Sequence, residues 1–155
     1  MTMRDDIANT IAALPFRVDT RDWHGLTALF TPHIVIDYTS LLGGEVRRTT
    51  RETQVASWRN LLLGFTATEH LIGTPLIAVT GEHAEAKASM IAWHFIADMG
   101  PAQDSWRVGG RYEIGLSRGN DDIWRISRLT LANGWQQGNL DLPKIAMDRV
   151  AAAKG

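Results

Sequence analysis

The sequence has no cysteine, and this absence removes several kinds of site at once. Disulfide bonds, thiolate metal centres and cysteine nucleophiles all need the missing thiol. The absence does not by itself identify the compartment in which the protein works.

The sequence also lacks an excess of one charge and a long hydrophobic run. Sixteen Lys and Arg residues stand against 17 Asp and Glu residues, so the formal net charge is −1 and no electrostatic footprint for nucleic acid or an anionic membrane is present. No apolar stretch approaches membrane-spanning length, and the opening MTMRDDIANT carries acidic residues where a signal peptide has a basic and then an apolar run. We therefore expect a soluble, cytoplasmic protein that binds neither nucleic acid nor membranes.

The chain has the length of one domain. Its 155 residues contain no internal repeat, linker or low-complexity segment. A chain of this size buries about two thirds of its unfolded surface around one core. The sequence therefore predicts a single domain that spans residues 1–155.

The most informative stretch runs from Ala84 to Asp98. Apolar and small residues alternate here with Glu85, Lys87 and Ser89 at a period of two, which predicts a long, half-buried β-strand. The inward face is mostly alanine, so it leaves volume for another element or a ligand, and its one polar group is His94. A lone histidine on such a face is more often a core residue satisfied by one hydrogen bond than a functional group.

The remaining elements follow from periodicity and from capping and turn residues. Helical spacing and cap residues predict helices over 2–18, 22–30, 50–65 and 141–154. Alternation and turn signals predict strands over 33–40, 45–50, 66–79, 105–118 and 123–135. This order predicts an α+β fold in which a cone-shaped, mostly antiparallel sheet wraps around the N-terminal helices.

Four short fragments resemble one known superfamily: DTRDW at 19–23, IDYTSLL at 36–42, TEHLIGT at 68–74, and the strand that ends in WH at 93–94. Together with the order of elements, they are similar to the nuclear transport factor 2-like, or SnoaL-like, superfamily, and within it to the scytalone dehydratases. The resemblance implies the cystatin-like α+β barrel and a lyase activity. It also implies that no cofactor is needed.

Carried over position by position, the resemblance implies a set of catalytic residues. Asp19 matches a catalytic aspartate at the end of the first helix, and His94 matches its partner histidine. His70 matches a second pocket histidine, and Tyr38 matches a tyrosine that holds water against the substrate carbonyl. A related lyase, hexachlorocyclohexane dehydrochlorinase, is similar in the same places but pairs the aspartate with the histidine that matches His70.

The sequence departs from the scytalone dehydratase pattern in two places. Val18 stands where the family has a second tyrosine. Arg111 and Glu113 stand at the positions of a serine and an asparagine, and the match implies that they bind substrate. These departures leave the identity of the substrate open.

The resulting hypothesis is a β-elimination on a small hydroxy-carbonyl compound. His94, oriented by Asp19, takes a proton from the carbon beside a carbonyl, since an imidazole with an ordinary pKa near 6.5 can act as a base near neutrality. Tyr38 stabilises the enolate directly or through water, and an imidazolium of His94 or His70 protonates the departing hydroxyl.

Other functions remain open on the same residues. The scaffold also suits an isomerase, a cyclase or a dehydrohalogenase, and Asp37 would be the base of a ketosteroid-isomerase-like site. Asp19, His70 and His94 have the composition of a facial iron triad, although their separation in sequence gives no spacing signal.

A third class of function is non-enzymatic, because proteins of this fold also act as assembly domains or ligand carriers. Trp93 and Phe95 point outward on the long strand and would be costly to expose. We therefore expect a homo-oligomer, a dimer or trimer, formed through the convex face of the sheet.

Overall fold

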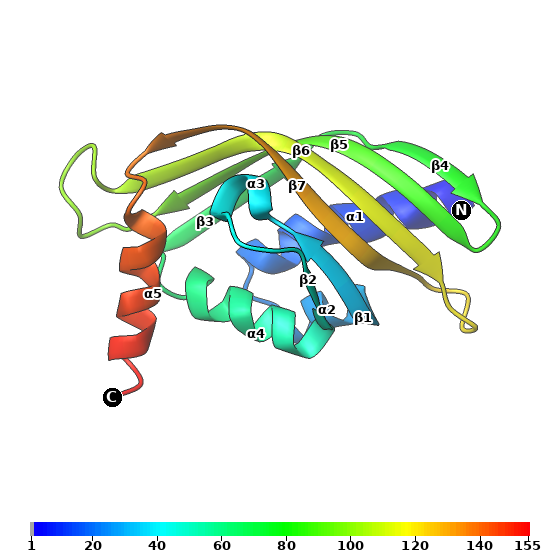
Figure 1. Ribbon diagram of the computed structural model, residues 1–155, viewed down its shortest axis with the longest axis horizontal. Helices are drawn as coiled ribbons and strands as arrows, with labels where there is room; N and C mark the ends of the chain where they lie inside the picture. The colour runs from blue at the N-terminus through cyan, green and yellow to red at the C-terminus, as the bar shows by residue number, and fades with distance from the viewer. Residues whose placement is uncertain (1) are drawn as a thin grey trace.

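A curved, open sheet of seven strands dominates the computed structural model, which describes residues 2–155 (Figure 1). The strands are β1 (Phe30–Asp37), β2 (Arg47–Thr50), β3 (Ala67–Ile72), β4 (Leu76–Thr80), β5 (His83–Phe95), β6 (Ser105–Arg118) and β7 (Trp124–Gly138). The helices are α1 (Met3–Asp19), α2 (Trp23–Ala28), α3 (Thr39–Leu42), α4 (Arg51–Leu62) and α5 (Leu142–Ala152).

The strand order is β2-β1-β7-β6-β5-β3, and β4 pairs with the other end of β5. All pairings are antiparallel except that of β1 with β7. The sheet arches over α1, α2 and α4, which lie on its concave side (Figure 1). This arrangement confirms the predicted α+β cone, although the sheet stays open instead of closing into a barrel.

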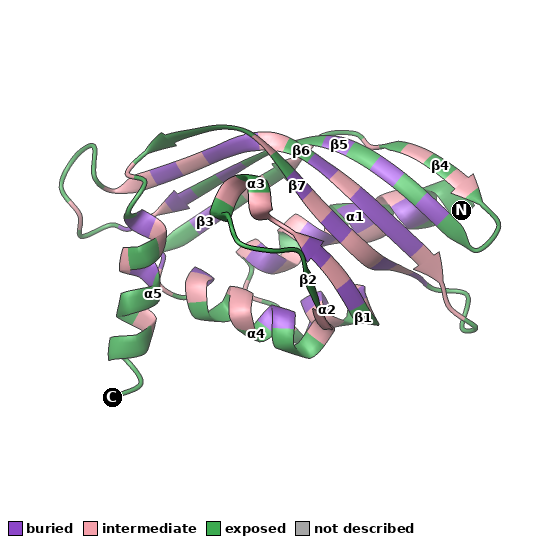
Figure 2. Cartoon of the chain, in the orientation of Figure 1, coloured by how far each residue is buried: buried purple, intermediate pink, exposed green. Residues whose placement is uncertain are grey.

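Strand β5 has the alternation that the sequence predicts. Even-numbered residues from Ala84 to His94 are buried and odd-numbered residues from His83 to Trp93 are exposed, as the alternating colours along β5 show (Figure 2). Small side chains on the concave face let α1 approach, and Ile7, Ile11 and Leu14 of α1 are at most 5% exposed. The core therefore lies between the sheet and the N-terminal helix.

Helix α1 begins and ends where its cap residues indicate. The Thr2 hydroxyl accepts a hydrogen bond from the Asp5 backbone N–H, and the Asp5 carboxylate accepts one from the Thr2 N–H, which is a capping box. Pro15 lies inside the helix and removes one backbone donor. The helix continues to Asp19, so this carboxylate stands at the C-terminal end of the helix.

The strand predicted over 66–79 is interrupted. It forms two strands, β3 and β4, separated at Gly73–Pro75, and both pair with β5. Pro75 has no N–H to donate to a ladder, which explains the break. The break also shifts the alternation, because even-numbered residues are the less exposed ones in β3 and odd-numbered residues in β4, where Leu76 is 78% exposed.

The segment after β1 also differs from the prediction. Strand β1 ends at Asp37, and a one-turn helix, α3, follows directly after Tyr38. The Asp37 carboxylate accepts hydrogen bonds from the backbone N–H and the hydroxyl of Thr39, at 3.1 Å and 2.7 Å. Asp37 therefore shapes the turn that places Tyr38.

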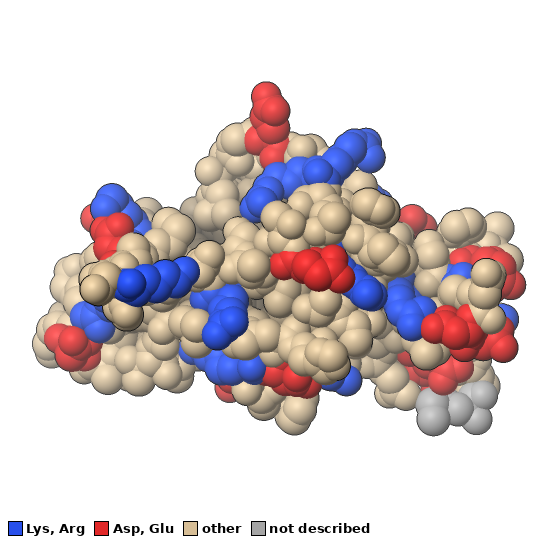
Figure 3. Space-filling view, turned by 90° about the horizontal axis from the view of Figure 1, so that it is seen from below, with Lys and Arg blue, Asp and Glu red and all other residues tan. Residues whose placement is uncertain are grey.

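The surface carries interspersed charges. Basic and acidic side chains alternate over the face seen in Figure 3, without a large field of one sign. Among residues 2–155, no helix has the length and apolar character needed to cross a bilayer.

Candidate active site

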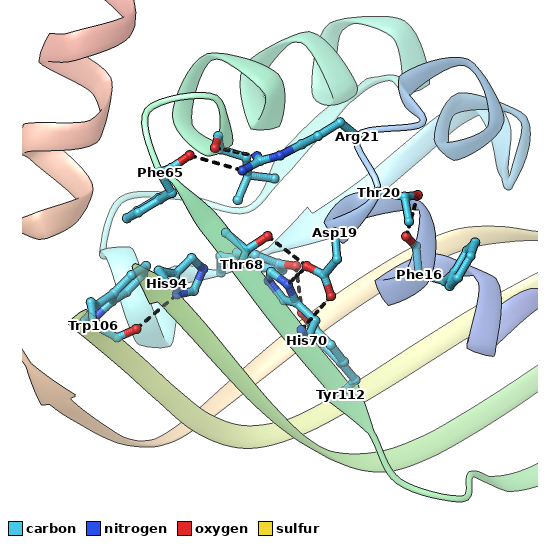
Figure 4. Close-up of polar contacts among 12 residues, drawn as sticks. Phe16, Asp19, Thr20, Arg21, Phe65, Thr68, His70, His94, Trp106 and Tyr112 are labelled. Carbon is cyan, nitrogen blue, oxygen red and sulfur yellow. Dashed lines mark hydrogen bonds and ion pairs between the residues drawn. The ribbon is translucent and has the colours of Figure 1, made fainter. Parts of the chain in front are cut away.

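Asp19 is held at the junction between α1 and α2. Two residues later, Arg21 has a φ of 60°, in the left-handed region that non-glycine residues rarely adopt. The Arg21 guanidinium donates hydrogen bonds to the carbonyl oxygens of Leu62 and Phe65, the latter at 3.3 Å (Figure 4). These bonds tie the turn to the end of α4 and so fix where the helix presents its last carboxylate.

The Asp19 carboxylate points at β3 and accepts three hydrogen bonds from it. Its Oδ1 lies 2.7 Å from His70 Nδ1 and 2.8 Å from the Thr68 hydroxyl, and its Oδ2 lies 2.7 Å from the His70 backbone nitrogen (Figure 4). The backbone contact fixes the carboxylate relative to the strand, and the ring contact fixes the orientation of the imidazole. Asp19 and His70 therefore form a dyad.

The environment of Asp19 keeps it ionised. Burial raises its pKa, but the hydrogen bonds and the charge of His70, together with the Thr68 hydroxyl, outweigh this effect and hold the pKa below its usual value. An ionised carboxylate can only accept hydrogen bonds, so His70 Nδ1 must carry the hydrogen between them. In a neutral His70 ring, Nε2 is then left with the lone pair.

The structure does not pair Asp19 with His94, so this predicted pairing is wrong. His94 Nδ1 lies 3.2 Å from the carbonyl oxygen of Trp106, and the ring packs between those of Phe65 and Trp106. It meets His70 edge to face at 5.2 Å between centroids. Burial, with the charge of His70, lowers the pKa of His94 to about 3, so this ring is neutral near pH 7.

Two tyrosine hydroxyls lie together near the dyad. Tyr38 Oη and Tyr112 Oη are 3.3 Å apart, and burial raises the pKa of both phenols, so both stay protonated and able to donate. Tyr38 is among the residues that the resemblance implies, but Tyr112 is not. The feature that could have identified Tyr112 is its position on the inward face of β6, where it lies directly opposite the small residue Ala88 of β5.

His70 of the dyad and the two tyrosines line one partly open, mostly apolar pocket, here called the inner cavity. Val18, which replaces the family's second tyrosine, forms part of its apolar wall. His94 is not among the residues that line it. Those residues are Leu14, Pro15, Val18, Tyr38, Trp58, Leu62, His70, Ile72, Tyr112 and Leu129.

Arg111 and Glu113, the residues expected to bind substrate, lie elsewhere. They alternate with the inward-facing Tyr112 on β6, so they face the convex side of the sheet. Glu113 pairs there with Lys87 at 3.5 Å, and Arg111 is exposed. The structure does not bring either side chain to the inner cavity.

The facial-triad alternative has no matching geometry. Within residues 2–155, no three His, Asp or Glu side chains are arranged to hold a metal ion. Asp19 Oδ1 and His70 Nδ1 bond to each other, and His94 Nδ1 faces a backbone carbonyl.

A model of the SnoaL-like domain matches residues 1–130. The chain belongs to the SnoaL-like domain family. No curated protein matches it. The family assignment confirms the resemblance stated above from four short fragments.

Solved structures agree with this assignment. The Kfla4162 protein from Kribbella flavida is 25% identical, with a TM-score of 0.84 over 91% of this SnoaL-like domain and 96% of that chain. A candidate scytalone dehydratase from Novosphingobium aromaticivorans is 17% identical, with a TM-score of 0.74 over 86% and 85%. A hexachlorocyclohexane dehydrochlorinase is 14% identical, with a TM-score of 0.72 over 87% of each. At such identities the last two show a shared fold.

Proposed function

We propose that this SnoaL-like domain is a cofactor-independent lyase that eliminates water from a small hydroxy-carbonyl compound. The observation that carries the proposal is the Asp19–His70 dyad, because its His70 ring lines the same apolar pocket as two paired phenols. A base held by a carboxylate and a hydrogen-bond donor for an oxyanion are the two groups that such an elimination needs.

The reaction begins with His70. Its Nε2 takes a proton from the carbon beside the substrate carbonyl, and ionised Asp19 stabilises the imidazolium that forms. Tyr38 or Tyr112 donates to the carbonyl oxygen as it gains negative charge, and the second phenol donates to the first. The sequence analysis placed His94 in the role of base, and we assign that role to His70 because its ring lines the inner cavity.

The elimination then completes without external reagents. The enolate reforms its carbonyl, the new carbon–carbon double bond forms, and the bond to the β-hydroxyl breaks. The imidazolium of His70 returns its proton to the departing hydroxyl, which leaves as water. The base is regenerated, so protons and electrons balance within one turnover.

The test uses two aryl ketones. Wild-type protein should convert 4-hydroxy-4-phenylbutan-2-one to 4-phenylbut-3-en-2-one, measured by absorbance. It should also exchange the α-protons of 4-phenylbutan-2-one in D₂O, measured by NMR, which tests the base and the phenols without a leaving group. His70→Gln should lower both rates by roughly 10²- to 10⁴-fold, the usual contribution of a general base.

A matched control is the same substitution on the neighbouring histidine. His94→Gln changes a ring that does not line the inner cavity, and it should retain most of the exchange activity. A His70→Gln variant as active as wild type would refute the proposal, as would a wild-type protein with neither activity above buffer.

Dehydrohalogenation is the second candidate. The pairing of Asp19 with His70, and not with His94, is the pairing that the resemblance to the dehydrochlorinase implies. The apolar wall of the inner cavity also suits a halogenated hydrocarbon. Release of chloride from a chlorinated cyclohexane, lost in His70→Gln, would favour this reaction over dehydration.

A further inference from the structure

A second hollow lies directly beside the inner cavity. It is an open groove, here called the side groove, between α4 on one side and α3 with the loop 43–46 on the other. Its lining residues are Ile36, Tyr38, Thr39, Leu42, Gly43, Gly44, Glu45, Val46, Arg47, Gln54, Ser57, Trp58, Leu61 and Met147.

The side groove shares a wall with the inner cavity. Tyr38 and Trp58 line both spaces, and their ring centroids are 6.4 Å apart. The Tyr38 hydroxyl is one of the two phenols of the candidate active site. A molecule that placed its carbonyl at the phenols would therefore meet the side groove beyond these two rings.

The rim of the side groove carries exposed apolar side chains beside the charged Glu45 and Arg47. Leu42 of α3, Val46 of the following loop and Met147 of α5 are 62%, 49% and 49% exposed, although they come from three separate segments. Exposed apolar side chains that converge on one hollow are typical of a ligand site.

The floor of the side groove holds a buried polar group without a partner. Gln54 is 2% exposed, and its Oε1 has no hydrogen-bond partner among residues 2–155. A buried amide oxygen in this state is costly, and such groups in native structures call for an explanation. The terminal torsion of glutamine is soft, so the amide can turn its oxygen towards a donor seated in the side groove.

We propose that the side groove binds the distal part of the substrate and that Gln54 Oε1 accepts a hydrogen bond from a hydroxyl or amide N–H there. The substrate class is then an extended compound, with a reacting carbonyl end in the inner cavity and an aryl or similar apolar arm that ends in a donor. The inference rests on the proposed function only for which end of the molecule reacts.

The test measures binding with a matched pair of ketones. 4-(4-Hydroxyphenyl)butan-2-one carries a donor on its distal ring, and 4-(4-methoxyphenyl)butan-2-one carries only an acceptor at the same position. Isothermal titration calorimetry of wild-type protein should show that the hydroxy compound binds roughly 5- to 10-fold more tightly, as expected for one hydrogen bond. Equal affinities, or a preference for the methoxy compound, would overturn the proposal.

Two substitutions at the same position separate the hydrogen bond from folding. Gln54→Leu keeps the approximate size and should abolish the preference for the hydroxy compound, while Gln54→Glu keeps an acceptor and should retain it. Leu42→Ser on the exposed rim should weaken binding of both aryl ketones and leave the preference unchanged. A preference that survives in Gln54→Leu would refute the role of Gln54.

The binding preference for the hydroxy compound can be measured independently of catalysis. His70→Gln should keep the preference for the hydroxy compound, because the side groove is intact in this variant. Loss of turnover with a retained preference leaves the side groove established whatever reaction is found. Turnover without any preference keeps the proposed function and removes the side groove from it.

Discussion

The His70 ring lies between two groups whose pKa values are lowered for different reasons. Asp19 has its pKa lowered by its contacts with His70 and Thr68 despite burial, so it stays charged. His94 has its pKa lowered to about 3, chiefly by burial, so it stays neutral. The His70 ring therefore has the Asp19 carboxylate on its Nδ1 side and the neutral His94 ring as an edge-to-face neighbour. Asp19 is thus the partner for any positive charge that develops on His70.

The buried state of His94 predicts how stability depends on pH. Unfolded His94 binds a proton with a pKa near 6.5, whereas the folded protein binds it only near pH 3. Between these values the unfolded state holds more protons, so the free energy of unfolding falls as the pH falls, by at most about 1.4 kcal/mol per pH unit. Urea unfolding at a series of pH values from 7 to 4 measures this slope.

The variant His94→Phe isolates this contribution. A phenyl ring can keep the packing against Phe65 and Trp106 but cannot bind a proton, so its slope should be shallower than that of wild type. Asp19, whose pKa is lowered in the folded protein, adds a loss of stability as the pH falls through the ordinary carboxyl pKa of about 3.9, and both proteins share that loss. Identical slopes in the two proteins would mean that His94 titrates normally in the folded state.

Individual residues show which features of the site could be predicted from the sequence. Alternation predicted an inward face for His94, and the structure confirms it, but alternation does not say which strand passes the end of α1. That depends on the position of β3 at the sheet edge, a long-range property. Arg111 and Glu113 alternate with the inward-facing Tyr112 along β6, so they face the other side of the sheet. Only the resemblance implied that they bind substrate.

The elements were predictable where one local signal acted alone. The run of alanines in β5 and the capping box of α1 each determine their element, and both appear as predicted. The break between β3 and β4 was harder, because the alternation continues through Pro75 in the sequence while its missing N–H ends the ladder. The one-turn helix after Tyr38 begins at Thr39, which donates two hydrogen bonds to the Asp37 carboxylate, and periodicity cannot detect a single turn.

The docking of α5 gives a prediction at the scale of elements. Leu142 and Ala146 of α5 are fully buried, and a methyl group on Gly64 would lie 2.0 Å from the carbonyl oxygen of Ala146. Gly64→Ala must push α5 away from the end of α4, which should cost about 1–3 kcal/mol. The melting temperature should fall by roughly 2–4 °C for each kcal/mol, measured by differential scanning calorimetry.

Gly73→Ala is the matched control for this substitution. A methyl group at Gly73 would have its nearest neighbour, the carbonyl oxygen of Ser89, at 3.6 Å, which is an ordinary contact. Its melting temperature should stay close to that of wild type. Equal effects of the two substitutions would show that Gly64 is not the contact that positions α5.

For the whole molecule, the convex face of the sheet is divided into two halves. One half carries ion pairs between strands, Lys87 with Glu113 and Glu85 with Arg128. The other half carries large apolar side chains from three strands, and these side chains are 45–61% exposed. These side chains are Leu71, Ile91, Trp93 and Trp135. The Arg107 guanidinium stacks 3.9 Å over the Trp93 ring.

The homo-oligomer expected from the sequence stays a prediction, and the apolar half is the surface through which it would form. A second copy of the chain would cover the apolar half with the same surface, and the interspersed charges beside it can pair across a two-fold axis. Wild-type protein should therefore elute as an oligomer in size-exclusion chromatography with light scattering. Trp93→Glu removes an aromatic side chain from the apolar half and places a carboxylate there, and it should shift the protein towards the monomer, because removing a charge from water at an interface is costly.

Lys87→Glu provides the control for this shift, since it introduces the same side chain on the same strand and face, in the half that carries ion pairs. It loses one exposed ion pair, worth roughly 0–1 kcal/mol, and should leave the oligomeric state unchanged. A monomeric wild type would show that the apolar half stays open in solution. Equal dissociation by both variants would show that net charge, and not the position of Trp93, controls association.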